Sequence, residues 1–181
     1  MATWTTRGLR GSTLEEMINY SLEKYREKHL ALIQKIPTPI KPIEMDQATR
    51  HITLAYFDQK STVDYIGVVQ GIPVCFDAKE CAADTIPLAN IHEHQLNFMR
   101  EFEEQGGISF ILLGMSHRDE CFYIPLADIE RFWQRAKEGG RKSFTYKEID
   151  KSYEIYGASG LSLHFLVQLQ KDLASREKGE K

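Results

Sequence analysis

The sequence predicts a single α/β domain in which a mixed β-sheet is flanked by helices on both faces. Three observations predict this class. Residues 61–80 are rich in Val, Ile, Tyr and Phe on either side of Gln70-Gly71, which predicts a β-hairpin. Apolar residues recur at helical spacing over about 13–28, 87–104 and 126–137. Apolar runs at 108–113 and 120–124 predict further strands between the helices, an alternation typical of α/β folds.

The composition is that of an ordinary globular chain. Its 181 residues, 42% hydrophobic and 27% charged, suffice for one domain with a sizeable core. There is no run of 18 apolar residues to span a membrane, and residues 1–11 lack the apolar run of a secretory signal. Three cysteines without paired metal-ligand spacing favour reduced thiols and a cytoplasmic location. The net charge of −3 does not itself indicate nucleic-acid binding, although acidic residues concentrate in 61–140.

The N-terminal third predicts a helix, a strand and a projecting segment. Residues 1–11 are expected to be mobile, and Ser12 or Thr13 should cap the first helix. Residues 30–36 predict a short strand. Three prolines within 37–42 stop both helix and central strand, so about 37–50 should project as a Pro-rich stalk. This segment is either a plain surface loop or an arm that contacts a large ligand. Residues 51–57 alternate as a strand, expected to join the main sheet with 31–36, 63–69 and 72–79.

The C-terminal half predicts helices and loops around the sheet. Gln95 is the polar exception in the apolar stripe of the helix over 87–104, so it is either a buried amide bonded to backbone or an oxygen aimed at a site. His92 and His94 are two residues apart, so they should not share a helix face or form a zinc pair. Arg141 and Lys142, in a glycine-led loop, are either solvated or phosphate contacts. A last helix carries leucines at 163, 166, 169 and 173, and about 174–181 should be a disordered tail.

The hairpin carries the residues that point to chemistry. With the turn at Gln70-Gly71, Asp64 and Asp77 should be directly opposed, with Cβ atoms about 5 Å apart. Two carboxylates in this position repel unless a hard divalent cation lies between them. Lys79 projects from the same face as Asp77 and could stabilise charge on a phosphate or hold a water. An Asp followed by Asp-X-Lys is the core of the PD-(D/E)XK nucleases, although a hairpin with solvated Asp and Lys has the same spacing.

Further motifs follow one another along the chain: Arg10-Gly11-Ser-Thr-Leu14-Glu15, Lys35-Ile-Pro37-Thr-Pro39-Ile40, Ala55-Tyr56-Phe57, Ser61-Thr62-Val63-Asp64-Tyr65-Ile-Gly67, Phe76-Asp77-Ala78-Lys79-Glu80, Pro87-Leu88, His92-Glu-His94-Gln95, Gly107-Ile108 and Gly140-Arg141-Lys142-Ser143. In this order they resemble the RecU family of Holliday junction resolvases, and the resemblance covers about residues 7–170. It implies a restriction-endonuclease-like fold and Mg²⁺-dependent hydrolysis that nicks four-way DNA junctions symmetrically in recombination and repair.

The resemblance also implies roles for residues and partners. The Mg²⁺ ligands would be Thr62, Asp64, Asp77 and Gln95, with Mn²⁺ able to substitute, and Lys79 would stabilise the transition state. The Pro-rich stalk would enter the centre of a four-way junction. Family members form homodimers and bind and modulate the RecA recombinase. Candidate DNA contacts are the basic residues in the flanking segments, Arg10, Lys35, Lys41, Arg50, Arg141 and Lys142.

Two departures from the family pattern bear on activity. Asp77 stands where the family usually has Glu, so a metal would have to shift or use a water ligand. The N-terminal segment lacks the longer basic leader of some relatives, which should weaken non-specific DNA affinity. Two alternatives therefore stay open: a non-catalytic junction-binding protein that acts through RecA, and a related nuclease that cuts linear duplex.

Overall fold

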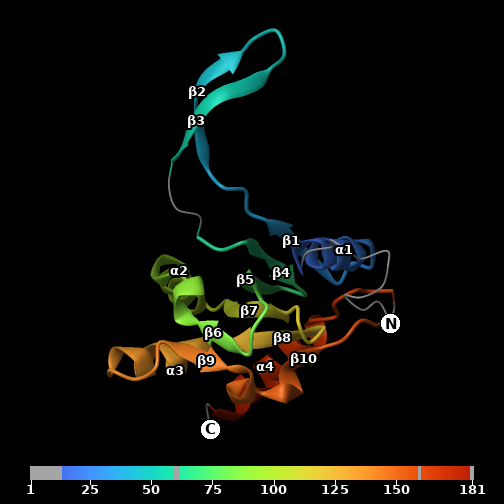
Figure 1. Cartoon of the computed structure of the whole chain (residues 1–181). Helices are drawn as coiled ribbons and strands as arrows, with labels where there is room; N and C mark the ends of the chain where they lie inside the picture. Colours follow the sequence, from blue (N-terminus) through green and yellow to red (C-terminus); the bar gives the residue numbers. More distant parts are fainter. Residues whose placement is uncertain (1–13, 59–61, 159, 180–181) are drawn as a thin grey trace.

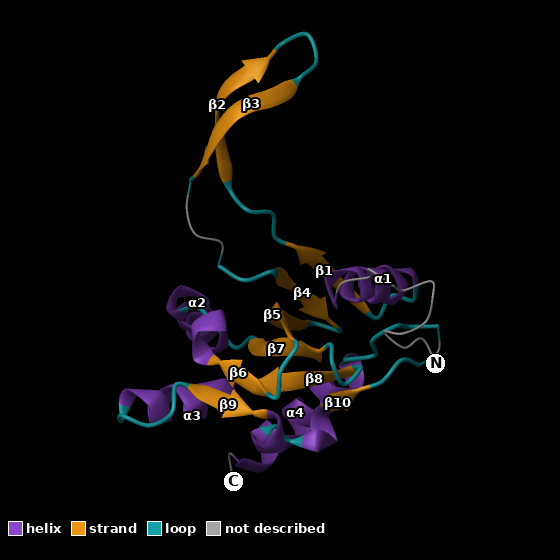
Figure 2. Ribbon diagram, viewed as in Figure 1, coloured by secondary structure: helices purple, strands orange, loops and turns teal. Residues whose placement is uncertain are grey.

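A computed structural model describes residues 14–58, 62–158 and 160–179 (Figures 1 and 2). Its four α-helices in that part of the chain are α1 (Leu14–Glu27), α2 (Glu93–Glu104), α3 (Leu126–Lys137) and α4 (Leu166–Gly179). Its strands are β1 (Ala31–Lys35), β2 (Ile40–Asp46), β3 (His51–Phe57), β4 (Tyr65–Val69), β5 (Ile72–Cys81), β6 (Thr85–Pro87), β7 (Ile108–Met115), β8 (Glu120–Pro125), β9 (Ser143–Thr145) and β10 (Glu154–Ile155). Residues 1–13, with the predicted cap and Arg10, lie outside the described part.

The main sheet has six strands in the order β1-β4-β5-β7-β8-β10. All neighbouring strands are antiparallel except β5 and β7, which run parallel because α2 carries the chain back across one face. Helices α1 and α4 supply apolar residues to the core on one face, and α2 and α3 to the core on the other. The predicted mixed α/β sheet with helices on both faces is therefore confirmed.

Stacked aromatic rings tie the middle of the sheet together. The rings of Tyr65 and Phe76 lie 4.7 Å apart, those of Phe76 and Phe110 4.8 Å, and those of Phe110 and Tyr123 4.2 Å. These residues come from β4, β5, β7 and β8, and all are fully buried. Each aromatic pair adds about 0.5–1.5 kcal/mol beyond its burial. The stack fixes β5, the strand that carries Asp77 and Lys79, between its neighbours.

The stalk is a hairpin and is longer than predicted. Strands β2 and β3 pair only with each other among the described strands, and Figure 1 shows them projecting away from the main sheet. The expectation that residues 51–57 join the main sheet was therefore wrong. The alternation that predicted a strand is real, but β3 pairs with β2 rather than with β1 or β4, so none of its residues is buried in the core. Pro42 is accommodated beside a shift in the β2–β3 register.

Two C-terminal expectations also need correction. Helix α4 continues to Gly179, so residues 174–179 are helical rather than a disordered tail. The cause is Arg176, whose guanidinium bonds to Glu103 on α2 at 2.9 and 3.0 Å and to Asp172 one turn back. Leu163, predicted to belong to the last helix, lies before α4 and is buried in the core. Among the described residues, no helix is long and apolar enough to cross a membrane.

The predicted helix over 87–104 is divided in the structure. The chain first pairs β6 with β9 in a small separate sheet, then makes a short 3₁₀ turn at Leu88–Asn90. Helix α2 begins only at Glu93, because His92 is in an extended conformation with φ −72° and ψ 142°. This late start decides how the side chains at the N-terminus of α2 are placed.

Candidate active site

The β4–β5 hairpin has the predicted register. Gln70 and Gly71 both have positive φ, 48° and 88°, as a two-residue type I′ turn requires. The pairing of Val69 with Ile72 extends to Tyr65 with Phe76, so Asp64 follows opposite Asp77. Val74 and Phe76 lie buried on the face that α1 covers, with Ala78 packed beside them. Asp77 and Lys79 alternate with these residues and therefore point to the other face.

The two carboxylates are locked together through the backbone. The Asp64 N–H donates to Asp77 Oδ1 at 3.1 Å, and the Ala78 N–H donates to Asp64 Oδ2 at 2.9 Å. Lys79 Nζ lies 2.6 Å from Asp77 Oδ2. The predicted trio of Asp64, Asp77 and Lys79 is thus brought together. The Ala78 N–H is a further member of the site that the sequence analysis did not name. A backbone group leaves no side-chain pattern in the sequence, and only the register of the hairpin places it beside Asp64.

Asp77 is in an electrostatically costly position. Its side chain is fully buried, and this burial raises its pKa to about 7. Lys79 opposes the rise and the neighbouring charge of Asp64 adds to it. Asp77 Oδ2 faces Lys79 as an ion pair and accepts no backbone N–H of the described residues. A buried oxygen with spare lone pairs beside a second carboxylate fits a hard divalent cation.

Carboxylates alone would not complete a metal site. In the described ranges, no group of three or more His, Cys, Asp or Glu side chains could hold a metal ion. A cation between Asp64 and Asp77 would therefore need other oxygen donors, and Thr62 and Gln95 are the predicted ones. Thr62 is half-buried and lies two residues before Asp64. Gln95 is buried on the first turn of α2, and α2 packs against β5 and β7.

The N-terminus of α2 explains both Gln95 and the histidines. Gln95 Oε1 accepts a hydrogen bond from the His92 N–H at 3.2 Å, which forms half of a capping box. Of the two predicted roles, the amide bonded to backbone is therefore the one observed. The rings of His92 and His94 stack, with centroids 5.4 Å apart and planes 11° apart. The expectation that they share no face was wrong, because His92 precedes the helix.

The predicted DNA contacts are spread over separate regions. Lys41 and Arg50 belong to the stalk, where Lys41 pairs with Asp58 at 2.6 Å and Arg50 is exposed at positive φ. Lys35 ends β1 and pairs with Glu15 on α1. In the other basic segment Arg141 pairs with Glu148 at 2.8 Å, and exposed Lys142 accepts the Leu88 N–H through its carbonyl. The described ones do not form one cluster, and the charged side chains of Lys35, Lys41 and Arg141 already have intramolecular partners.

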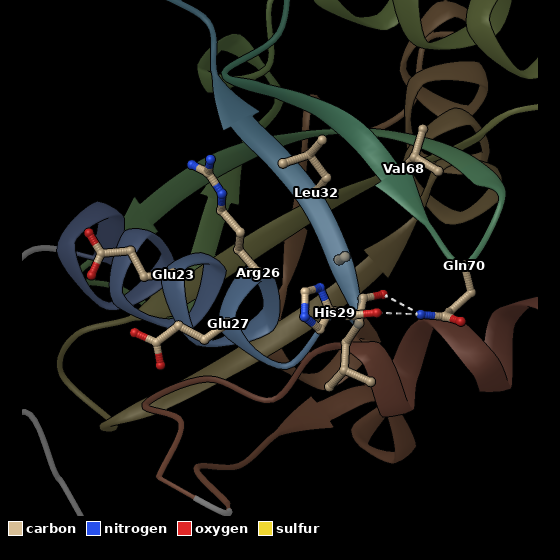
Figure 3. A pocket seen from close by; sticks show the side chains of 9 residues that line it. Glu23, Arg26, Glu27, His29, Leu32, Val68 and Gln70 are labelled. Atoms are coloured by element: carbon tan, nitrogen blue, oxygen red, sulfur yellow. Dashed lines mark hydrogen bonds between the residues drawn. The ribbon is translucent and has the colours of Figure 1, made fainter.

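An open hollow lies elsewhere, at the free edge of β1. Figure 3 shows its lining of α1 residues, Leu32 on β1 and Val68 on β4, with Gln70 Nε2 bonded to the carbonyls of His29 and Leu30. None of the predicted site residues lines this hollow. The candidate site is therefore the carboxylate pair of the hairpin, where the buried Asp77 lies, and not this hollow.

The fold and the β4–β5 hairpin together indicate a class of enzyme. A mixed sheet that presents Asp64 opposite an Asp-X-Lys strand has the arrangement predicted for PD-(D/E)XK nucleases. The family model for Recombination protein U, RecU, matches residues 9–171, and the chain belongs to this family.

Several relatives match over most of their length. The chain is 41% identical over 169 residues to "Holliday junction resolvase RecU" of Oenococcus oeni, covering 91% of this chain and 86% of that one. It is 37% identical over 172 residues to the Limosilactobacillus reuteri protein of the same name, covering 92% and 84%. A solved structure of Archaeoglobus fulgidus Hjc, a Holliday junction resolvase, matches with a TM-score of 0.41 and 12% identity over 75% of this chain and 89% of that one. At that level it bears on neither fold nor function here.

Proposed function

We propose that this protein is a Holliday junction resolvase, an endonuclease that makes symmetrical nicks in four-way DNA junctions during recombination and repair. The observation that carries the proposal is the interlocked trio of Asp64, Asp77 and Lys79, with Asp77 buried and charged groups on both sides of it. Membership of the RecU family and the names of the relatives support it. The whole chain would act as a single nuclease domain.

Asp64 and Asp77 would hold Mg²⁺, or Mn²⁺ in its place, with help from Thr62 and Gln95. Such a cation acidifies a bound water and polarises a phosphate when bound. Gln95 Oε1 accepts the His92 N–H with one lone pair, which leaves its second lone pair for a cation. Lys79, whose side chain is partly exposed beside the buried Asp77, would neutralise charge that develops on the phosphate oxygens.

The stalk hairpin, β2 and β3, would enter the junction centre. Its exposed apolar side chains support a role in an assembly, because a two-stranded ribbon buries little on its own; they are Ile40, Ile43, Met45, Ile52, Leu54, Tyr56 and Phe57. We propose that a homodimer places one site on each of two related strands, and that the protein works with RecA in the cytoplasm. The stalk cations and the 141–142 loop would contact phosphates.

The test is cleavage of a synthetic four-way junction beside a linear duplex of the same sequence, with and without Mg²⁺ or Mn²⁺. Paired symmetrical nicks in the junction, absent without metal and lost in Asp77→Ala, are the expected result. Tight junction binding without cutting in either metal would instead indicate a non-catalytic accessory protein. Linear duplex cut as fast as the junction, or metal-independent cutting by Asp64→Asn, would also contradict the proposal.

A further inference from the structure

Lys79 lies where a positive charge is needed in the candidate site. Its Nζ is 2.6 Å from Asp77 Oδ2, and its side chain is 19% exposed while that of Asp77 is fully buried. The two residues are two apart on one strand, so their side chains leave β5 on the same face. The lysine thus reaches from the solvent side to a carboxylate that water does not reach.

The Lys79 ammonium is the group that approaches Asp77 Oδ2, at 2.6 Å. No backbone N–H of the described residues donates to this oxygen. Two of the other carboxylate oxygens, Asp77 Oδ1 and Asp64 Oδ2, are held differently, because each accepts a backbone N–H. Replacing the ammonium by another cation would leave both backbone bonds in place. Oδ2 is therefore the exchangeable position of the site.

We propose that Lys79 is the counter-ion of Asp77 in the metal-free protein and leaves this carboxylate when a divalent cation binds. The inference rests on the proposed function, which assigns a cation to Asp64 and Asp77. An ammonium and a divalent cation repel each other strongly at one buried oxygen, so the two occupy it in turn. Once released, the partly exposed Lys79 is free to face the substrate phosphate. Cation binding and the positioning of Lys79 are then a single coupled event.

The first measurement is Mn²⁺ binding without DNA, by titration calorimetry at pH 8. Lys79→Met keeps the apolar stem and removes the competing charge, so it should bind Mn²⁺ at least about tenfold more tightly than wild type, or about 1.4 kcal/mol. Lys24→Met is the matched control, because Lys24 also makes an ion pair, at 2.7 Å to Glu27, but on the surface of α1. Its Mn²⁺ affinity should be unchanged. Equal or weaker binding by Lys79→Met overturns the inference.

The second measurement uses wild-type protein and does not depend on a variant folding. Limited acylation of lysines, followed by mass spectrometry, reports how accessible and reactive each lysine amine is. Labelling of Lys79 should rise when Mn²⁺ is added, while that of Lys24 stays constant. Unchanged or reduced labelling of Lys79 overturns the exchange.

A third variant separates this inference from the proposed function. Asp77→Asn should bind Mn²⁺ far more weakly than wild type. If it binds Mn²⁺ equally well, the cation site itself is wrong and the proposed function fails with it. If only the Lys79 results fail, the resolvase proposal stands and the exchange is refuted.

Discussion

Asp77→Asn should stabilise the metal-free protein at alkaline pH while it abolishes cleavage. Burial of Asp77 raises its pKa from an ordinary 3.8 to about 7. Each pKa unit corresponds to about 1.4 kcal/mol, so the charged carboxylate costs the fold about 4 kcal/mol at most. Asparagine has no charge to desolvate, but an amide nitrogen at the Oδ2 position would face the Lys79 ammonium, which costs about 1–3 kcal/mol. The expected net gain in the free energy of unfolding is therefore about 2 kcal/mol.

The pH dependence of this gain gives the sharper check. Because the folded-state pKa of Asp77 lies above the unfolded one, the folded protein holds the proton more tightly. The cost of the charge is fully present above about pH 7 and disappears as the pH falls towards 3.8. Urea titrations in EDTA at pH 8 and pH 4.5 should show a gain at pH 8 that is mostly absent at pH 4.5. A variant no more stable than wild type at pH 8 would refute the reasoning.

Three further predictions concern parts of the molecule away from the carboxylates. The hydrogen bond from Arg135 lowers the pKa of Glu148 to about 2. The ionised carboxylate therefore stabilises the fold above about pH 4.5, and this contribution is lost as the pH falls towards 2. In an acid titration, the free energy of unfolding of Glu148→Gln should fall less steeply than that of wild type. Arg176→Met should lower the free energy of unfolding by about 1–3 kcal/mol in a urea titration, because it leaves the carboxylates of Glu103 and Asp172 without this ion pair. The control Arg131→Met removes an exposed ion pair and should have little effect. The two ends of the stalk are close together, because the Asp58 N–H donates to the Pro39 carbonyl at 3.0 Å. A Gly-Gly link in place of residues 40–57 should therefore leave the melting temperature within a few degrees and abolish junction-selective cleavage. Unchanged selectivity would argue against the stalk role.

The candidate site could be predicted because it depends on a short-range relation. A two-residue turn at Gln70-Gly71 sets the register of β4 and β5, and that register alone brings Asp64 opposite Asp77. The same reasoning failed for residues 51–57, since alternation predicts a strand but not its partner. Only the long-range pairing with β2 takes that strand out of the main sheet.

The other errors have equally local causes. The composition of the last residues favoured disorder. In the structure, however, Arg176 donates a hydrogen bond to Glu103, 73 positions earlier in the chain, and such a long-range contact cannot be predicted from local composition. The helix containing Gln95 was predicted to begin too early, since Pro87 and an apolar run resemble a helix start. In the structure those residues form β6 and a 3₁₀ turn, so His92 is the N-cap of α2.

The single parallel pairing in the sheet has a consequence for how the site assembles during folding. The β4–β5 hairpin closes over a two-residue turn, so Asp64 and Asp77 can meet through contacts close in sequence. Strand β7 can join β5 only after the chain from 82 to 107 has closed a long loop, and α2 arrives with it. The carboxylate pair would thus form early, and α2, which carries the proposed ligand Gln95, would dock in a later, slower step. Variants that weaken the docking of α2 should therefore leave the hairpin formed but the site incomplete.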